Sequence, residues 1–165
     1  IILISGPTYL KPPEEIKVIN VVSADDMRKE TLKYFPNCDV LIMTAAVSDW
    51  KPEKKSNEKL KIKHEWDLKL IPTPDILKDV SMLKKENQIV IGFALETNNI
   101  KEEAIKKLKE KKIDLIVANT PDFFGEGKVS PVLFISKDEK IILNEKNSKE
   151  KIAEKIVELV DTYRE

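Results

Sequence analysis

The fold of this chain is most clearly indicated by the sequence Asp39-Val40-Leu41-Ile42-Met43-Thr44-Ala45-Ala46-Val47-Ser48-Asp49-Trp50. Its first five residues form a short apolar run, which is typical of a strand buried on both faces. The alanines that follow leave the backbone uncovered, so that a flat ligand can lie against it. Open α/β sheets bind ligands at the carboxyl ends of their strands. Taken alone, however, the stretch is more typical of a strand that runs into a solvated loop.

Strands and helices alternate along the rest of the chain. Apolar runs predict strands at 1–5, 16–22, 39–45, 88–94 and 113–118, and a late hairpin at 131–136 and 140–143. Helices are expected at 24–34 with Ser23 as N-cap, from Pro74 to about 85, at 99–111 and at 149–163, the last with Ile152, Ile156, Val157 and Val160 inward. This order predicts one α/β domain over 1–165, a Rossmann-like, doubly wound and mostly parallel sheet.

The segment of about 50–72 is predicted to be a Lys-rich flap hairpin. Lys59, Lys61 and Lys63 alternate with apolar residues, and a second short alternation follows at 68–70. Three ammonium groups on one strand face are unfavourable unless water or an anion relieves the repulsion. The segment is therefore either an anion-binding flap or a solubilising surface hairpin. The single histidine, His64, lies beside it and is more often incidental at such a position.

Composition excludes several classes of protein. The 165 residues contain 29 Lys and Arg and 29 Asp and Glu, so no overall positive field recruits nucleic acid. The single Cys38 excludes an internal disulfide and a cysteine metal cluster, which suits a cytoplasmic protein. No apolar run reaches membrane-spanning length, and no signal peptide is visible. An anion site must therefore be a local cluster.

A second candidate cation pair lies on the helix at 99–111. Lys107 and Lys111 are four residues apart and share a helix face, while Ala104, Ile105 and Leu108 form the buried stripe. On charge alone this helix is an ordinary solvated one, and spacing does not single out either lysine.

Six segments in order resemble phosphopantothenoylcysteine synthetase, usually the carboxyl-terminal half of a bifunctional coenzyme A biosynthesis flavoprotein. They are Ile4-Ser5-Gly6-Pro7, Thr44-Ala45-Ala46-Val47-Ser48-Asp49, Lys59-x-Lys61, Thr73-Pro74-Asp75-Ile76-Leu77, Gly92-Phe93-Ala94-x-Glu96-Thr97 and Asp114-Leu115-Ile116-Val117-Ala118-Asn119. The resemblance implies a C–N bond-forming ligase. It activates 4′-phosphopantothenate with CTP and Mg²⁺ to an acyl-cytidylate, and cysteine then attacks this intermediate.

The same resemblance implies which residues act. It assigns nucleotide contacts to Met43, Thr44, Ala45, Asp49, Lys59, Pro74, Asp75, Ile76, Leu77, Phe93, Lys107 and Lys111. Lys59 is the catalytic residue, in a flap that closes over the intermediate, and Ala46, Lys61 and Lys63 are substrate-contact candidates. Metal ligands are not assigned. The resemblance also implies a homodimer, and FMN only in a fused or partner phosphopantothenoylcysteine decarboxylase domain.

Three departures from the family pattern limit these assignments. Ile62 stands where the family's flap motif has a lysine, with Lys63 one step later, and the loop after Asn119 lacks the family's Gly-Ser-Asp-rich composition. The family's first βα unit, with its phosphate loop, is also expected upstream of Ile1, and the chain alone is expected to be inactive. The open alternatives are another nucleotide-binding α/β enzyme, such as a dehydrogenase, and a non-catalytic nucleotide-binding domain.

Overall fold

The computed structural model describes residues 1–56, 58–61, 63–121 and 130–164. The chain forms two compact units, which are described separately. The first comprises Ile1–Thr31 and Ala46–Ile76, and the second comprises Leu32–Ala45 and Leu77–Glu165. The predicted hairpin residue Ile62 and most of the loop after Asn119 lie outside the described residues.

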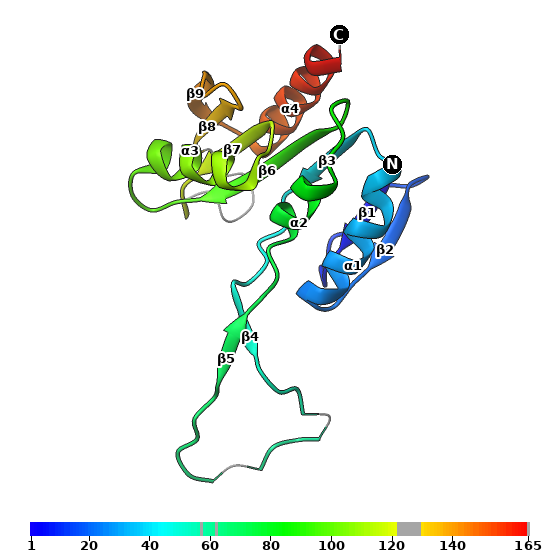
Figure 1. The fold of residues 1–165 in the computed structure, drawn as a ribbon, viewed down its shortest axis with the longest axis vertical. Helices are drawn as coiled ribbons and strands as arrows, with labels where there is room; N and C mark the ends of the chain where they lie inside the picture. The colour runs from blue at the N-terminus through cyan, green and yellow to red at the C-terminus, as the bar shows by residue number, and fades with distance from the viewer. Residues whose placement is uncertain (57, 62, 122–129, 165) are drawn as a thin grey trace. The chain divides into compact units, whose positions relative to one another are not determined.

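The second unit is built on a five-stranded sheet (Figure 1). Its order is β3 (Val40–Met43), β6 (Ile89–Leu95), β7 (Leu115–Asn119), β8 (Ser130–Ser136) and β9 (Ile141–Asn147). The first three strands are parallel, and β8 and β9 are antiparallel. The mostly parallel sheet with a late hairpin is therefore confirmed, and no end of a predicted strand is displaced by more than four residues.

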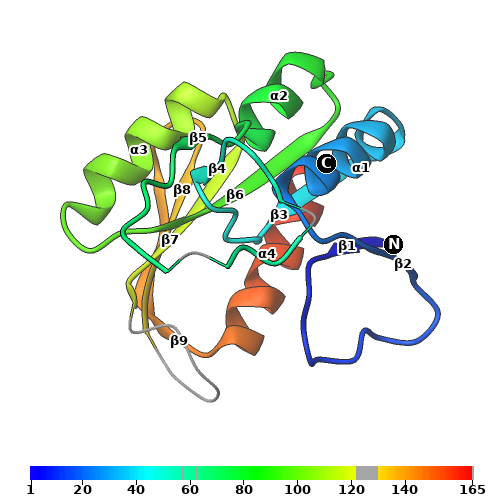
Figure 2. The same ribbon diagram turned by 90° about the horizontal axis from the view of Figure 1, so that it is seen from below.

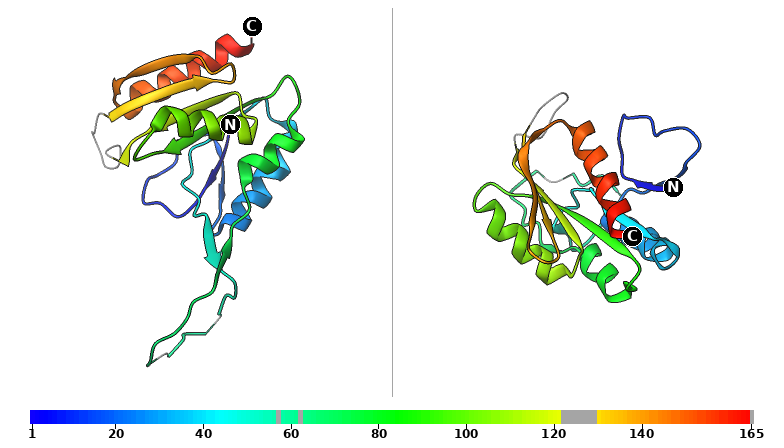
Figure 3. Two further views of the ribbon diagram at one scale, coloured as in Figure 1. Left: turned by 60° about the vertical axis from the view of Figure 1, so that its left-hand side comes forward. Right: turned by 90° about the horizontal axis from the view of Figure 1, so that it is seen from above.

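Helices cover both faces of this sheet (Figure 2). On one face, Ile89 and Ile91 of β6 share a core cluster with Ile152 and Ile156 of α4 (Lys149–Arg164). Gly92 points to the opposite face, where α2 (Ile76–Leu83) and α3 (Ile100–Lys111) pack. This arrangement confirms the doubly wound prediction. The helix α4 also packs against the β8–β9 hairpin, whose Val132 and Phe134 belong to the same core cluster (Figure 3).

The closing helix α4 departs from the prediction at one residue. Ile152 and Ile156 are buried and Val160 packs against the core cluster, but Val157 is 58% exposed. The inward stripe repeats every four residues, and Val157 is turned about 100° away from Ile156 around the helix axis.

Near the end of α4, burial raises the pKa of Tyr163, and the carboxylates of Asp114 and Asp138 raise it further.

The first unit contains the parallel pair of β1 (Ile2–Ser5) and β2 (Lys17–Asn20), followed by α1 (Ala24–Tyr34). The predicted helix bounds and the Ser23 N-cap are confirmed. The Asp26 N–H donates to Ser23 Oγ (3.1 Å), while the Ser23 N–H and hydroxyl donate to Asp26 Oδ2 (3.1 and 2.6 Å), which is a reciprocal capping box. The apolar run at 1–5 suggested a buried strand, but this is wrong, because β1 is exposed or half-buried along its length.

This capping box gives a first prediction. Ser23→Ala is expected to lower the free energy of unfolding by about 1 kcal/mol near neutral pH, because the Asp26 N–H loses its acceptor. The hydrogen bond from the Ser23 side chain lowers the pKa of Asp26 below its ordinary 3.8. The stabilisation by ionised Asp26 is thus fully present above the unfolded-state pKa, and it is lost as the pH falls through the lower pKa of the folded state.

Urea unfolding followed by circular dichroism measures this effect. The difference between wild type and Ser23→Ala should narrow as the pH falls below about 3.8. Ser56→Ala, which removes an exposed loop hydroxyl, is the control and should leave stability unchanged. An equal loss in both variants would contradict the cap assignment.

The predicted flap hairpin is shorter than expected. The strands β4 (Trp50–Pro52) and β5 (Leu70–Pro72) pair antiparallel, and an ion pair of 2.6 Å between Lys69 and Glu53 continues the pairing by one step. The described residues between them carry no helix or strand, as Figure 1 shows. The described residues of the strand predicted at 59–63 form no strand, because Leu60 is 53% exposed and like charges on one strand face repel one another.

The start of α2 also differs from the prediction. The helix begins at Ile76, so Pro74 and Asp75 precede it instead of opening it. The Thr73 N–H donates to the Asp49 carbonyl (2.9 Å), and the Thr73 hydroxyl donates to the Ser48 carbonyl. These bonds extend the β4–β5 ladder and hold the chain extended beyond Pro72. Asp75 then occupies the position before the first helical residue, where aspartate is a preferred N-cap.

Candidate functional site

In the second unit, several predicted site residues meet at the carboxyl ends of parallel strands. Met43 is the last residue of β3 and pairs in register with Gly92 of β6. Thr44 and Ala45 follow it and are exposed, which fits an uncovered strand end. Phe93 is one residue beyond Gly92 and is partly buried against the core cluster on the α4 face. This edge of the sheet is where open α/β folds bind ligands.

Leu77 contributes to the site through packing. A Cβ atom on Gly92 would lie 2.7 Å from Ile113 Cδ1 and 3.1 Å from Leu77 Cδ1, so any larger residue there would have to displace these two side chains. The side chains of Ile76 and Leu77 are 3% and 8% exposed. Their buried side chains are part of the core, so any ligand contact of these two residues falls to their backbone groups. The first N–H groups of a helix have no partner within the helix.

Lys107 is distinguished from Lys111 by its partner. The Lys107 ammonium lies 2.6 Å from Glu96 Oε1, and the two side chains are 38% and 14% exposed. Glu96 directly follows β6, so this pair lies at the carboxyl end of that strand. Lys111 lies one turn further along α3 and is half-buried. Sequence spacing singled out neither lysine, and Glu96 was quoted only as part of a motif.

The first unit brings two distant motifs together. The Thr73 bond to the Asp49 carbonyl places Asp49 beside the segment that leads into Pro74 and Asp75. Asp49 is exposed, as are Ala46 and Asp75, and Pro74 is half-buried. Next to this segment, the Lys51 ammonium lies 2.5 Å from Asp25 Oδ2. The β4–β5 pairing is thus what makes Asp49 and Pro74 neighbours, although they are 25 positions apart.

The three flap lysines lie in the long connection between β4 and β5. Lys59, Lys61 and Lys63 are all exposed, as is His64. The structure does not place them in a strand. Their predicted roles therefore rest on the resemblance and stay predictions.

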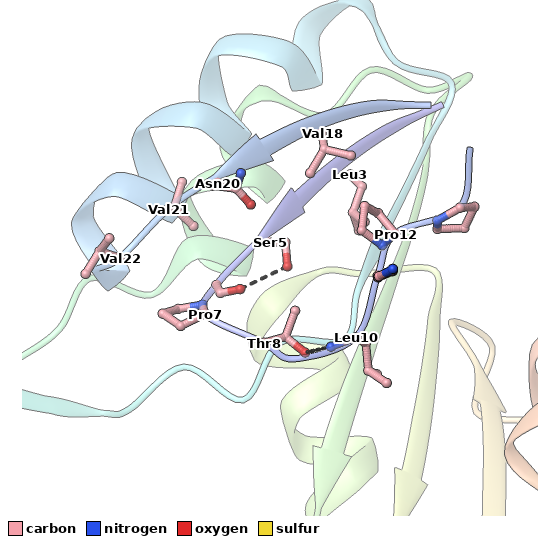
Figure 4. A pocket seen from close by; sticks show the side chains of 13 residues that line it. Leu3, Ser5, Pro7, Thr8, Leu10, Pro12, Val18, Asn20, Val21 and Val22 are labelled. Carbon is pink, nitrogen blue, oxygen red and sulfur yellow. Dashed lines mark hydrogen bonds between the residues drawn. The ribbon is translucent and has the colours of Figure 1, made fainter. Parts of the chain in front are cut away.

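A pocket of about 790 Å³ lies at the carboxyl ends of β1 and β2 (Figure 4). Its wall is mostly apolar, with Ser5, Thr8, Lys11 and Asn20 as polar members. The Ser5 hydroxyl donates to the Gly6 carbonyl (3.0 Å), and the Leu10 N–H donates to Thr8 Oγ1 (3.2 Å). None of the predicted site residues lines this pocket. Its sequence signal is the Pro-rich loop of 7–13 directly after β1. The family motif that begins at Ile4 includes only Pro7 of this loop.

Neither a cluster of metal-binding side chains nor a membrane-spanning helix is found among the residues that the structure describes. Within these ranges, no group of three or more His, Cys, Asp or Glu side chains is placed to hold a metal ion. Within the same residues, every helix is too short or too polar to cross a membrane.

Comparison with known proteins identifies the family. Residues 1–163 match the family described as the DNA/pantothenate metabolism flavoprotein C-terminal domain. The coenzyme A biosynthesis bifunctional protein CoaBC of Bacillus subtilis (strain 168) is 44% identical over 129 residues, which cover 77% of this chain and 32% of that protein. This chain spans less than half the length of the first curated relatives that it matches.

Two solved structures share the fold. The C-terminal domain of a coenzyme A biosynthesis bifunctional protein CoaBC superposes with a TM-score of 0.80 at 34% identity, covering 98% of this chain and 72% of that one. The H337A mutant of Cab2 in complex with phosphopantothenate-cysteine superposes with a TM-score of 0.66 at 15% identity, covering 91% of this chain and 54% of that one. The match over 163 residues places this chain in the family of the DNA/pantothenate metabolism flavoprotein C-terminal domain.

Proposed function

We propose that the protein containing this chain is a CTP-dependent phosphopantothenate–cysteine ligase in coenzyme A biosynthesis. The observation that carries the proposal is the family match over residues 1–163, joined to 34% identity with a CoaBC C-terminal domain of the same fold. The fold-level likeness to Cab2 bound to phosphopantothenate-cysteine agrees with that product.

The proposed reaction has two steps. The carboxylate of 4′-phosphopantothenate attacks the α-phosphorus of CTP and pyrophosphate leaves, which gives an acyl-cytidylate. The cysteine amine then attacks the acyl carbon, an amide bond forms, and CMP leaves with the proton balance taken up by solvent. No side-chain nucleophile is required, because the substrate itself provides the attacking oxygen.

Each residue has a role that its chemistry allows. Thr44 and Ala45 offer backbone groups at the end of β3, and Asp49 accepts hydrogen bonds from sugar hydroxyls. Lys107 contacts phosphate oxygens and opposes the negative charge that moves to the leaving pyrophosphate. Mg²⁺ would be held mainly by the phosphates of CTP, with one or two protein carboxylates at most, and would neutralise part of their charge.

The proposal extends to partners. The intact protein is a homodimer, and FMN belongs to a decarboxylase domain, fused as in the bifunctional relatives or separate. Size-exclusion chromatography with light scattering tests the dimer, and absorbance of the purified protein tests for bound flavin.

The nucleotide preference is testable by calorimetry on the intact protein. CTP with Mg²⁺ is expected to bind at least about 10-fold more tightly than ATP with Mg²⁺, because a polar site fitted to the cytosine edge leaves groups unpaired with the wrong base. Asp49→Asn should weaken CTP binding by about 10-fold, since a hydrogen bond to a charged group is lost.

Asp67→Asn, which changes an exposed carboxylate in the β4–β5 connection, is the matched control and should bind CTP normally. Equal affinity for CTP and ATP would remove the specificity. Binding of NADH in place of CTP would favour a dehydrogenase, and CTP binding without product formation would favour a non-catalytic domain.

A further inference from the structure

Glu96 holds an unusual position for a carboxylate. Its backbone N–H donates to the carbonyl of Asn119 (2.9 Å), which ties the residue after β6 to the end of β7. Its side chain is 14% exposed, and the Oε1 atom is buried. Within the described residues, this atom accepts no hydrogen bond of regular geometry, and its partner is the Lys107 ammonium at 2.6 Å.

This environment ties Lys107 to one place. A buried carboxylate that loses its cation is left with an uncompensated charge, which is strongly unfavourable. The ammonium therefore stays at Glu96 when it meets a second anion. An ammonium has three N–H donors, and the Lys107 side chain is more exposed than that of Glu96. It can thus keep one bond to Glu96 and direct others outward.

A second ion pair on the same helix shows the contrast. Lys109 and Glu139 lie 2.8 Å apart, but their side chains are 58% and 45% exposed. Such surface pairs contribute little, because water solvates both charges and the side chains remain free to rotate. Burial, and not proximity alone, distinguishes the Glu96–Lys107 pair on α3.

We propose that Glu96 is a positioning residue that fixes the ammonium of Lys107 at the carboxyl end of β6, where it binds the phosphate chain of the nucleotide. This inference rests on the proposed function and deepens it. A free lysine side chain loses rotamer freedom when it binds phosphate. Lys107 has already lost that freedom to Glu96, so the cation is in place before the reaction begins.

A double-mutant cycle on the intact enzyme tests the proposal. Lys107→Met is expected to lower kcat/KM for CTP by about 100-fold, since a cation facing developing charge is lost. Glu96→Gln should lower it by about 10-fold, because the ammonium is no longer fixed. The double variant should equal Lys107→Met within about twofold, since Glu96 acts only through Lys107.

Melting temperatures of these variants control for folding, and one further variant controls for charge. Lys107→Met leaves Glu96 buried without its cation, so its melting temperature should fall, and adding Glu96→Gln should restore it. Glu139→Gln, which removes the carboxylate of the exposed pair, should retain wild-type kcat/KM. An effect of Glu139→Gln equal to that of Glu96→Gln would assign the result to general charge and overturn the proposal.

The outcomes separate this proposal from the ligase assignment. Calorimetry of the same four proteins with inorganic pyrophosphate repeats the cycle without any turnover. Non-additive pyrophosphate binding with no ligase activity would refute only the proposed function. Losses that multiply in the double variant, or a Glu96→Gln variant with wild-type kinetics, would overturn the positioning role while leaving the ligase function in place.

Discussion

Asp114→Asn is expected to lower the free energy of unfolding of the second unit by about 2–4 kcal/mol, because it breaks a largely buried ion pair. Asp114 Oδ1 lies 3.1 Å from the Lys84 ammonium, and the side chains of the two residues are 11% and 17% exposed. Asp114 Oδ2 accepts a hydrogen bond of 2.8 Å from the Val90 N–H. The carboxylate thus joins the end of α2 to the starts of β6 and β7.

Hydrogen exchange of the β6 amides measures this loss, since their slowest exchange reports the opening free energy of the sheet. Asp138→Asn, in the exposed turn between β8 and β9, is the control and should change little. CTP affinity should persist under conditions where the variant is folded, because Asp114 lies at the amino ends of the strands. A change below about 0.5 kcal/mol would show that the pair is not stabilising.

Lys59→Gln is expected to reduce kcat of the intact enzyme by about 100-fold while changing the Kd for CTP by less than about threefold. The reason is that a flap cation acts on the closed, reacting state rather than on the initial complex. The structure shows how the two ends of this flap are held. The Lys69–Glu53 ion pair and the β4–β5 ladder anchor the two ends, and Lys59 is exposed between them.

Rapid-quench kinetics with labelled CTP separates binding from chemistry in this variant. Lys54→Gln changes an exposed lysine of the same connection and should turn over normally. The same assay on Lys63→Gln tests whether Lys63 supplies the family cation that Ile62 lacks. Unchanged turnover of Lys59→Gln would refute its catalytic role.

The sequence predicted the fold well wherever one local signal dominated. The apolar runs of β6 and β7 and the Ser23 cap of α1 gave elements close to those observed. The prediction failed where tertiary context decided the outcome. Leu60, in the alternation at 59–63, is 53% exposed, and the bonds from Thr73 hold the chain extended just before the start of α2. A periodic pattern indicates a strand only if something covers one of its faces.

The site was predicted mainly through the resemblance, and its internal contacts were not. Local spacing pairs residues three or four apart on a helix, whereas Glu96 and Lys107 are separated by a loop and two turns of α3. Similarly, Asp49 and Pro74 become neighbours only through the β4–β5 ladder. Such tertiary contacts depend on the fold of the whole chain, so local patterns in a single sequence do not predict them.

Gly92 has a further consequence for how nucleotide recognition can change. Its missing side chain leaves room for the side-chain ends of Ile113 and of Leu77, which lies in the first turn of α2. The buried Leu77 side chain thus packs the first turn of α2 against β6. In the proposed ligase, we expect nucleotide selectivity to depend on how these core elements pack as well as on the groups that face the base. Residues that never meet CTP could alter which nucleotide is accepted.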